Sequence, residues 1–204
     1  MKPRLHATTA ALAVAIGAAL PAVSTAQQST ARQDTGWAMP YERGFWGHAG
    51  LSLGRSELDI TCPAGAACDD TEQAFRAFVG GRFNNIIGGE IAYIKFGDFT
   101  RGGGETDVEG VDLALMAGIP FAKNWSVFGK LGGIYSQVDV TGTAPGLATG
   151  GENGWGPRAG VGLQMGLTEN WAIRADYDRY RIKVPGGGRE NVDTFLIGAQ
   201  YTFR

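Results

Sequence analysis

The sequence predicts an all-β protein, an eight-stranded antiparallel up-and-down transmembrane β-barrel, from three observations. Residues 192–203 alternate large or apolar side chains with mostly small or polar ones, which is typical of a strand with one apolar and one polar face. The chain begins with a secretory leader, and no long apolar run follows that leader. A membrane protein without apolar helices must close its sheet, because hydrocarbon cannot satisfy open strand edges.

Residues 1–26 have the layout of a signal peptide. Lys2 and Arg4 precede an apolar run over 7–23, and small residues up to Ala26 supply a cleavage point. A membrane-anchoring helix is the alternative, but the run is short for a span of about 20 residues. The expected parts are a signal peptide (1–26), a periplasmic lead-in (27–44) and the barrel domain (45–204).

Charge argues against a nucleic-acid partner. The chain has a net charge of −2 at pH 7, and removal of a leader that carries two basic residues makes it more acidic. A nucleic-acid-binding chain would instead show a basic patch or stripe.

Short turns alternate with long connections along the chain. Tight turns are expected at Asn84-Asn85, Lys123-Asn124 and Glu169-Asn170, because each separates two alternating runs at hairpin distance. Longer glycine-rich connections lie between them, at 57–72, 100–107, 141–154 and 185–191. The eight expected strands lie near 45–56, 73–83, 87–99, 108–120, 125–140, 155–167, 171–184 and 192–203.

The two faces of these strands differ in chemistry. In most of them one face is apolar and the other carries glycine and charge. A soluble eight-stranded barrel such as a lipocalin would turn its apolar face inward, and the short Gly44-Phe45-Trp46 match to lipocalins is weak support for that alternative. We expect the apolar face to meet lipid and the charges to lie inside. The expected interior charge network comprises Arg76, Arg82, Glu90, Asp112, Lys130, Arg158, Arg174, Asp176 and Asp178.

These interior charges have two interpretations. They form either a structural salt-bridge plug or a narrow gated ion path, since charges with little water around them must pair. Aromatic residues near the strand ends are expected to form two girdles at the lipid interfaces. The expected girdle residues are Phe83, Trp125, Trp171, Tyr201 and Phe203 beside the tight turns, and Tyr93, Tyr135 and Trp155 nearer the long loops.

Residues 45–203 resemble the transmembrane domain of outer membrane protein A and its small eight-stranded, porin-like relatives in Gram-negative bacteria. The stretches 46–54, 89–98, 124–132 and 171–180 carry the resemblance. It implies an outer membrane location with both termini periplasmic, and contact with outer membrane lipid and lipopolysaccharide. It also implies an assembly signal, Gly198, Tyr201 and Phe203, read by the barrel assembly machinery, from which Arg204 after the terminal aromatic is a departure.

Within this resemblance, Glu90, Lys130 and Arg174 match an inward acid, lysine and arginine of the family. Arg158 and Gln164 stand on the strand where the family also uses an acid, so the family's gating exchange is not carried over. Nothing follows the barrel, so we expect no peptidoglycan-binding domain.

No catalytic, metal or cofactor site is expected. His48 and Ser52 share the inward face of one strand, and a lone inward histidine is typical of a structural hydrogen bond. Cys62 and Cys68 are expected to form a disulfide, because exported chains meet an oxidising compartment. The acidic loop around them is expected to be solvated rather than to bind calcium.

The functional hypothesis is an outer membrane barrel with a structural and surface-interaction role, in membrane integrity and in loop-mediated adhesion or resistance through host or surface ligands. The alternative is a small passive pore or solute conduit. A lipid A-modifying enzyme is a third hypothesis, and we expect the protein not to be an enzyme.

Overall fold

The computed structural model describes residues 46–59, 68–84, 86–101, 104–142, 149–186 and 188–203. The predicted signal peptide and lead-in lie outside these residues, and the first strand begins at Trp46. Among the described residues, no helix is long and apolar enough to cross a membrane.

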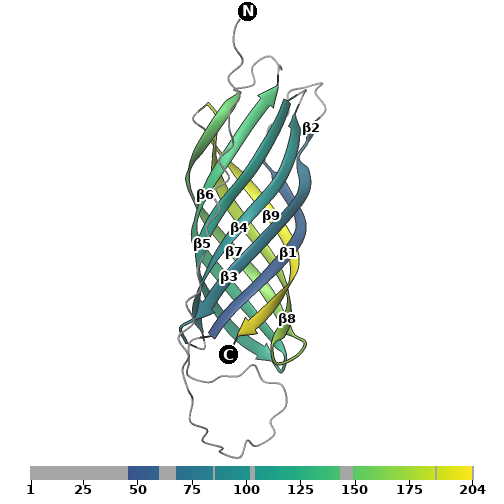
Figure 1. Cartoon of the computed structure of the whole chain (residues 1–204), viewed down its shortest axis with the longest axis vertical. Helices are drawn as coiled ribbons and strands as arrows, with labels where there is room; N and C mark the ends of the chain where they lie inside the picture. Colours follow the sequence, from purple (N-terminus) through teal and green to yellow (C-terminus); the bar gives the residue numbers. More distant parts are fainter. Residues whose placement is uncertain are drawn as a thin grey trace, which may run out of the picture. The chain divides into compact units, whose positions relative to one another are not determined.

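Eight long strands and one very short strand make up the described fold (Figure 1). The strands are β1 (Trp46–Leu58), β2 (Cys68–Asp69), β3 (Thr71–Arg82), β4 (Ile87–Arg101), β5 (Gly104–Ala122), β6 (Trp125–Gly142), β7 (Gly150–Gly166), β8 (Trp171–Val184) and β9 (Gly188–Phe203).

The eight long strands close into a barrel in which all neighbours are antiparallel. Each long strand pairs with the next one in sequence. The first and last strands complete the ring, from Gly47 opposite Phe203 to Leu58 opposite Val192. The eight-stranded up-and-down barrel predicted from the sequence is therefore confirmed.

Tight turns join the strands at one end of the barrel. The side-chain oxygen of Asn84 accepts hydrogen bonds from the backbone N–H groups of Ile86 and Ile87, at 2.8 and 2.7 Å. Thr168 does the same at the last tight turn, where its hydroxyl oxygen accepts from the N–H of Trp171 at 3.0 Å. Such side-chain caps fix the turns that set the strand register.

The strands run further toward the long loops than the sequence predicted. β5 begins at Gly104 and β7 at Gly150, where the predicted strands began at 108 and 155. The unpredicted β2 pairs with β4 through Cys68 opposite Arg101. These segments are polar or glycine-rich and look like loops in sequence, but ladder pairing with a neighbouring strand holds them extended.

The outer face of the barrel is apolar. Leu115 and Leu131 are 65% and 69% exposed, and Leu53, Val161 and Ile197 are also exposed. A soluble protein rarely exposes an apolar surface that is continuous around its circumference. The outer face is therefore suited to lipid.

Aromatic side chains gather on the outer face at two levels. Near the tight turns, Tyr201 packs edge-to-face against both Trp171 and Phe203, with ring centroids 5.1 Å apart in each case. On the loop side, Tyr135 packs against Trp155 at 5.6 Å. The exposed rings of Phe83, Trp125 and Tyr93 lie on the same outer face.

The interior has two layers, which the sequence analysis did not anticipate. Charged side chains fill the middle of the lumen, whereas its loop-side half holds a hydrophobic cluster with a few buried hydroxyl side chains, such as Ser56 and Ser136. We call this cluster the apolar cap; it comprises Leu58, Ala74, Ile94, Phe96, Phe99, Val108, Ile134, Val138, Val140, Tyr180, Ile182, Val192 and Leu196. The interior is therefore glycine-rich and charged, as expected, only between the apolar cap and the tight turns.

Candidate functional site in the barrel lumen

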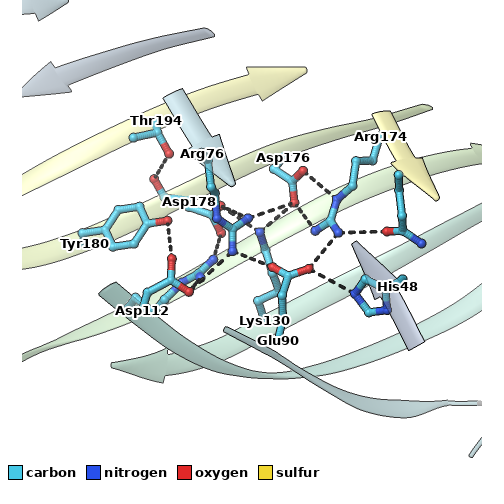
Figure 2. Close-up of polar contacts among 12 residues, drawn as sticks. His48, Arg76, Glu90, Asp112, Lys130, Arg174, Asp176, Asp178, Tyr180 and Thr194 are labelled. Carbon is cyan, nitrogen blue, oxygen red and sulfur yellow. Dashed lines mark hydrogen bonds and ion pairs between the residues drawn. The ribbon is translucent and has the colours of Figure 1, made fainter. Parts of the chain in front are cut away.

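Eight charged side chains meet inside the barrel, and we call them the interior charge cluster (Figure 2). All are buried, and they project from β3, β4, β5, β6, β7 and β8 because inward positions recur at every second residue. The cluster comprises Arg76, Glu90, Asp112, Lys130, Arg158, Arg174, Asp176 and Asp178.

Arg174 holds one side of the cluster. Its Nη1 donates to Oε2 of Glu90 at 2.8 Å, and its Nε and Nη2 donate to the two oxygens of Asp176 at 2.9 and 2.8 Å. Its guanidinium carbon lies 4.3 Å from the ring centroid of Phe78 and 4.8 Å from that of Phe128. Two aromatic faces and two carboxylates therefore fix this guanidinium in place.

Lys130 and Arg158 hold the other side. The Nζ of Lys130 donates to Asp176 at 2.6 Å and to Asp178 at 2.8 Å. Arg158 donates through Nη2 to Asp178 at 2.6 Å and through Nη1 to Asp112. Asp178 thus accepts from two cations that project from β6 and β7.

Arg76 lies at the centre, within reach of all four carboxylates. Its Nη2 is 2.5 Å from Oε1 of Glu90 and 3.5 Å from Asp112. Its Nη1 is 3.8 Å from Asp178 and 4.0 Å from Asp176. The cluster has four cationic and four anionic members, so its formal charges cancel. Charge balance is what makes burial of so many ionic groups tolerable.

Tyr180 joins the cluster to the apolar cap. Its hydroxyl donates to Asp112 at 3.4 Å, and its ring packs edge-on against Phe96 with centroids 5.0 Å apart. The guanidinium carbon of Arg158 lies 5.0 Å from the same ring centroid. The ionic layer and the apolar layer are therefore in direct contact.

Glycines on the inward face make room for neighbouring large side chains. A Cβ at Gly160 would collide with the carboxylate of Asp178, and one at Gly80 would lie 2.7 Å from the ring of His48. The side chains that fill the space at these two glycines are an acid and an imidazole.

His48 lies at the edge of the cluster. Its Nε2 is 3.5 Å from Oε2 of Glu90, and the side chain is buried. Ser52 is also buried on β1. Neither group faces the lipid side of the barrel, where a lipid-modifying nucleophile would have to act.

Of the nine charged residues expected in the lumen, Arg82 is the one outside the cluster as defined here. It is half-buried at the tight-turn end of β3, with its guanidinium beside Gly118. Sequence reasoning did not assign roles to Phe78, Phe128 and Tyr180. The sequence did contain a signal for these aromatic residues, because each stands two residues from a cluster member on the same strand and therefore shares its inward face. Phe78 stands two residues from Arg76, Phe128 from Lys130 and Tyr180 from Asp178.

The predicted disulfide involves Cys62, which lies outside the described residues, while Cys68 lies in β2. Within the described ranges, no group of three or more His, Cys, Asp or Glu residues is arranged to hold a metal ion.

A closed barrel with an apolar outer face, two aromatic levels and an ion-paired lumen is an outer membrane β-barrel. Residues 10–203 match the family described as the outer membrane protein beta-barrel domain, and the chain belongs to that family.

Curated relatives include outer membrane protein A of Serratia marcescens, 28% identical over 211 residues, covering 94% of this chain and 55% of the relative. Outer membrane protein A of Yersinia pseudotuberculosis is 29% identical over 141 residues, covering 62% of this chain and 39% of the relative. The chain thus spans about half the length, or less, of these relatives.

Solved structures with the same fold include Neisserial surface protein A, with a TM-score of 0.55 and 14% identity, covering 78% of this chain and 97% of that one. OprG of Pseudomonas aeruginosa has a TM-score of 0.50 and 16% identity, covering 82% and 99%. The attachment invasion locus protein Ail of Yersinia pestis has a TM-score of 0.50 and 20% identity, covering 77% and 99%.

Proposed function

We propose that this protein is a non-conducting structural barrel of the outer membrane that displays its long loops for surface interactions. One observation carries the proposal: the lumen is filled by the interior charge cluster and, on the loop side, by the apolar cap. Eight strands enclose only enough interior for side chains, and here those side chains pair with one another.

A conducting path would have to cross both layers. An ion entering the charge cluster must displace partners such as Glu90 from Arg76, held at 2.5 Å, or Asp176 from Lys130, held at 2.6 Å. It must then cross the cap, where Ile94, Phe96 and Val138 have no solvent exposure. Ions are strongly disfavoured in such apolar surroundings, which argues for a sealed interior.

Planar-bilayer recording of the refolded protein tests this proposal. We expect no resolved openings at moderate voltage, with heat-modifiable gel migration showing that the same sample is folded. Steady ohmic openings from the folded protein would favour the alternative, a small passive pore. The same recording with Arg174→Ala and Glu90→Ala together asks whether the charge cluster contributes to the seal.

We propose that both termini are periplasmic and that the segments 57–72, 100–107, 141–154 and 185–191 face outward. An even number of long strands returns the chain to its starting side, and the tight turns lie together at the other end from these segments. Protease cleavage within 141–154 on intact cells is the expected result. Cleavage there only after rupture of the outer membrane would contradict the orientation.

The remaining proposals concern processing and assembly. Residues 1–26 act as a signal peptide and 27–44 as a periplasmic lead-in, while Gly198, Tyr201 and Phe203 act as the signal for the barrel assembly machinery. No catalytic role is proposed, because His48 and Ser52 both lie inside the barrel. Unchanged lipid A mass spectra in cells with and without His48→Ala would agree with this.

A further inference from the structure

The ladder between β7 and β8 stops before either strand ends. Its last pair toward the loops is Arg158 opposite Tyr180. Beyond that pair, residues 150–157 of β7 stay paired with β6, and residues 181–184 of β8 stay paired with β9. The two stretches are not paired with each other, so β7 has a strand edge on the side of β8. We call residues 150–157 of β7 the unpaired edge.

Pro157 explains why the ladder stops at this place. In an antiparallel ladder, the N–H and C=O of one residue point to the same side, and successive residues alternate between the two neighbouring strands. Pro157 stands opposite Gly133 of β6, and that ladder continues on both sides of it. A residue without an N–H fits there when its own backbone groups point away from β6. The missing N–H is therefore on the β8 side, where the ladder ends.

The same alternation leaves backbone groups without ladder partners further along β7. Gly151, Asn153 and Trp155 share the direction of Pro157, so their N–H and C=O groups point toward β8, and none has a ladder partner there within the described residues. Gly151 and Asn153 are exposed and lie past Trp155 of the loop-side aromatic level, on the water side of the lipid interface. An exposed edge of this kind is a template for pairing with another strand.

The space beside the unpaired edge widens toward the loops. A Cβ at Gly156 would collide with the carbonyl oxygen of Arg181, whereas a Cβ at Gly150 would have no neighbour within 4 Å. Between these two positions, the Lys183 side chain crosses from β8. Its Cδ and Nζ lie 2.8 and 3.2 Å from the position that a Cβ of Gly154 would take, on the inward side of β7. This lysine lies where a side chain of an added strand would lie.

The residues of the unpaired edge favour a basic segment with bulky side chains. Gly151 and Gly154 have no side chains, so large residues of an added strand can cover their backbone. Glu152 lies on the inward row of β7 and makes no ion pair within the described part of the chain. Asp139 lies on the outer face of β6, opposite Gly151. These two acids complement a cation on either face of an added strand.

We propose that the unpaired edge binds an extended, basic segment of another protein, which adds to β7 as a further strand. Gly151, Asn153 and Trp155 supply the backbone hydrogen bonds. Glu152 receives a lysine or arginine side chain of the segment, in the place that Lys183 now holds. Backbone pairing provides the affinity in this mode of binding, and alternate side chains provide the specificity. The inference rests on the surface-interaction part of the proposed function and names the class of partner.

Fluorescence anisotropy of a labelled synthetic peptide, added to the refolded barrel in detergent, tests the proposal. The probe alternates lysine with tyrosine over about six residues, a usual strand length. The same peptide with N-methyl groups on alternate residues cannot complete a ladder and is expected to bind about tenfold more weakly. A peptide with glutamate in place of lysine is expected to bind about tenfold more weakly as well.

The peptide series has three outcomes that would overturn the proposal. The first is the absence of binding by the lysine–tyrosine peptide. The second is equal affinity of the N-methylated peptide, which would exclude strand addition. The third is equal affinity of the glutamate peptide, which would exclude a basic partner.

Two variants at Asn153 test the place of binding. Asn153→Pro removes one N–H from the unpaired edge and leaves the donors to β6 in place, so peptide affinity is expected to fall about tenfold. Asn153→Thr is the matched control, because it changes the same side chain and keeps the N–H, and it should bind the peptide as the wild type does. Heat-modifiable gel migration shows that both variants are folded. Equal affinities of the two folded variants would overturn the assignment to this edge.

Variants at Lys183 and Glu152 test the position of the basic side chain and do not alter the backbone. Lys183→Thr removes the competing cation and is expected to raise the affinity for the lysine–tyrosine peptide about threefold to tenfold, whereas Lys183→Arg should leave it unchanged. Glu152→Gln should reduce the preference for the lysine peptide over the glutamate peptide. An unchanged affinity in Lys183→Thr, or an unchanged preference in Glu152→Gln, would contradict the proposed contact.

The peptide measurements do not depend on conductance. An open wild-type pore would overturn the proposed sealed barrel and leave peptide binding at the unpaired edge standing. Loss of peptide binding in a barrel that stays closed would overturn this inference alone.

Discussion

Arg174 and Glu90 face each other across the lumen, and Nη1 of the arginine donates to Oε2 of the acid over 2.8 Å. They project from β8 and β4, and three long strands separate β4 from β8 in either direction around the ring. This ion pair therefore ties opposite walls of the barrel together. The same arginine binds Asp176 on its own strand, so one guanidinium joins both walls.

Removal of Arg174 should destabilise the barrel. Arg174→Ala leaves Glu90 and Asp176 short of a cation in a buried site, and the free energy of unfolding is expected to fall by about 3–5 kcal/mol. Urea unfolding in lipid vesicles, followed by tryptophan fluorescence, measures this change. Arg179→Ala is the control, because it breaks an exposed pair with Asp193 and should cost no more than about 1 kcal/mol.

A double-mutant cycle adds a sharper test of the same pair. Glu90→Ala together with Arg174→Ala should cost less than the two single changes added, because the double variant leaves no orphaned partner in this pair. Strict additivity would mean that the two side chains do not act as a pair in the membrane.

The lipid-facing assignment of the outer wall predicts a depth-dependent response to charge. Leu131→Arg should cost about 2–4 kcal/mol in a bilayer, because the 69% exposed leucine contacts hydrocarbon there. Gln137→Arg, further along the same outward row and past Tyr135, should be close to neutral. Urea titration in vesicles compares the two variants, and equal costs would contradict a lipid-facing wall at Leu131.

Strand number, turn positions and membrane-facing side chains were predictable from sequence because they depend on local alternation. β8 illustrates this: Trp171, Ile173 and Tyr177 are exposed on the outward row, and Ala172, Arg174 and Asp176 are buried on the inward row. Turn residues such as Asn84 fix the register, and one register determines the face of every later residue in the strand.

The apolar cap was missed because the alternation continues while its polarity reverses. Past Tyr177, β8 places Arg179 and Arg181 outward and Tyr180 and Ile182 inward. The loop-side part of the strand is thus built like a soluble barrel, with its apolar side inside. A reading that assigns one polarity to a whole strand cannot separate these two halves, although the reversal itself is visible in the sequence.

The partners of each charge were beyond sequence reasoning for a different reason. Alternation assigns Asp178 to the interior, but Lys130 and Arg158 reach it from two other strands. Which cations meet which acids depends on the stagger of the closed ring and on side-chain length. Neither can be read from a single strand.

The apolar cap should contribute to stability independently of the charge cluster. Phe96→Ala creates a cavity beside Tyr180 and should lower the free energy of unfolding by about 3–5 kcal/mol. The Phe96→Ala barrel should still not conduct ions, because the charge cluster in the middle of the lumen is unchanged. Phe195→Ala is the control, since Phe195 is exposed on the outer face. If both changes had the same cost, the cap would not be a packed core.

The seam between β1 and β9 sets a steric requirement at Gly198. A Cβ at this position would lie 2.7 Å from the Cα of Ser52 and would collide with the carbonyl oxygen of Leu51. Gly198→Val should therefore destabilise the closed barrel by about 1–3 kcal/mol and lower the yield of the heat-modifiable form after refolding into detergent. Gly47→Val in the same seam should refold normally, because its nearest new contact is at an ordinary distance.

Refolding takes place without any assembly machinery, so a defect in detergent reports sterics alone. A Gly198→Val barrel that refolds fully in detergent but does not accumulate in cells would instead place the requirement at Gly198 in the proposed assembly signal.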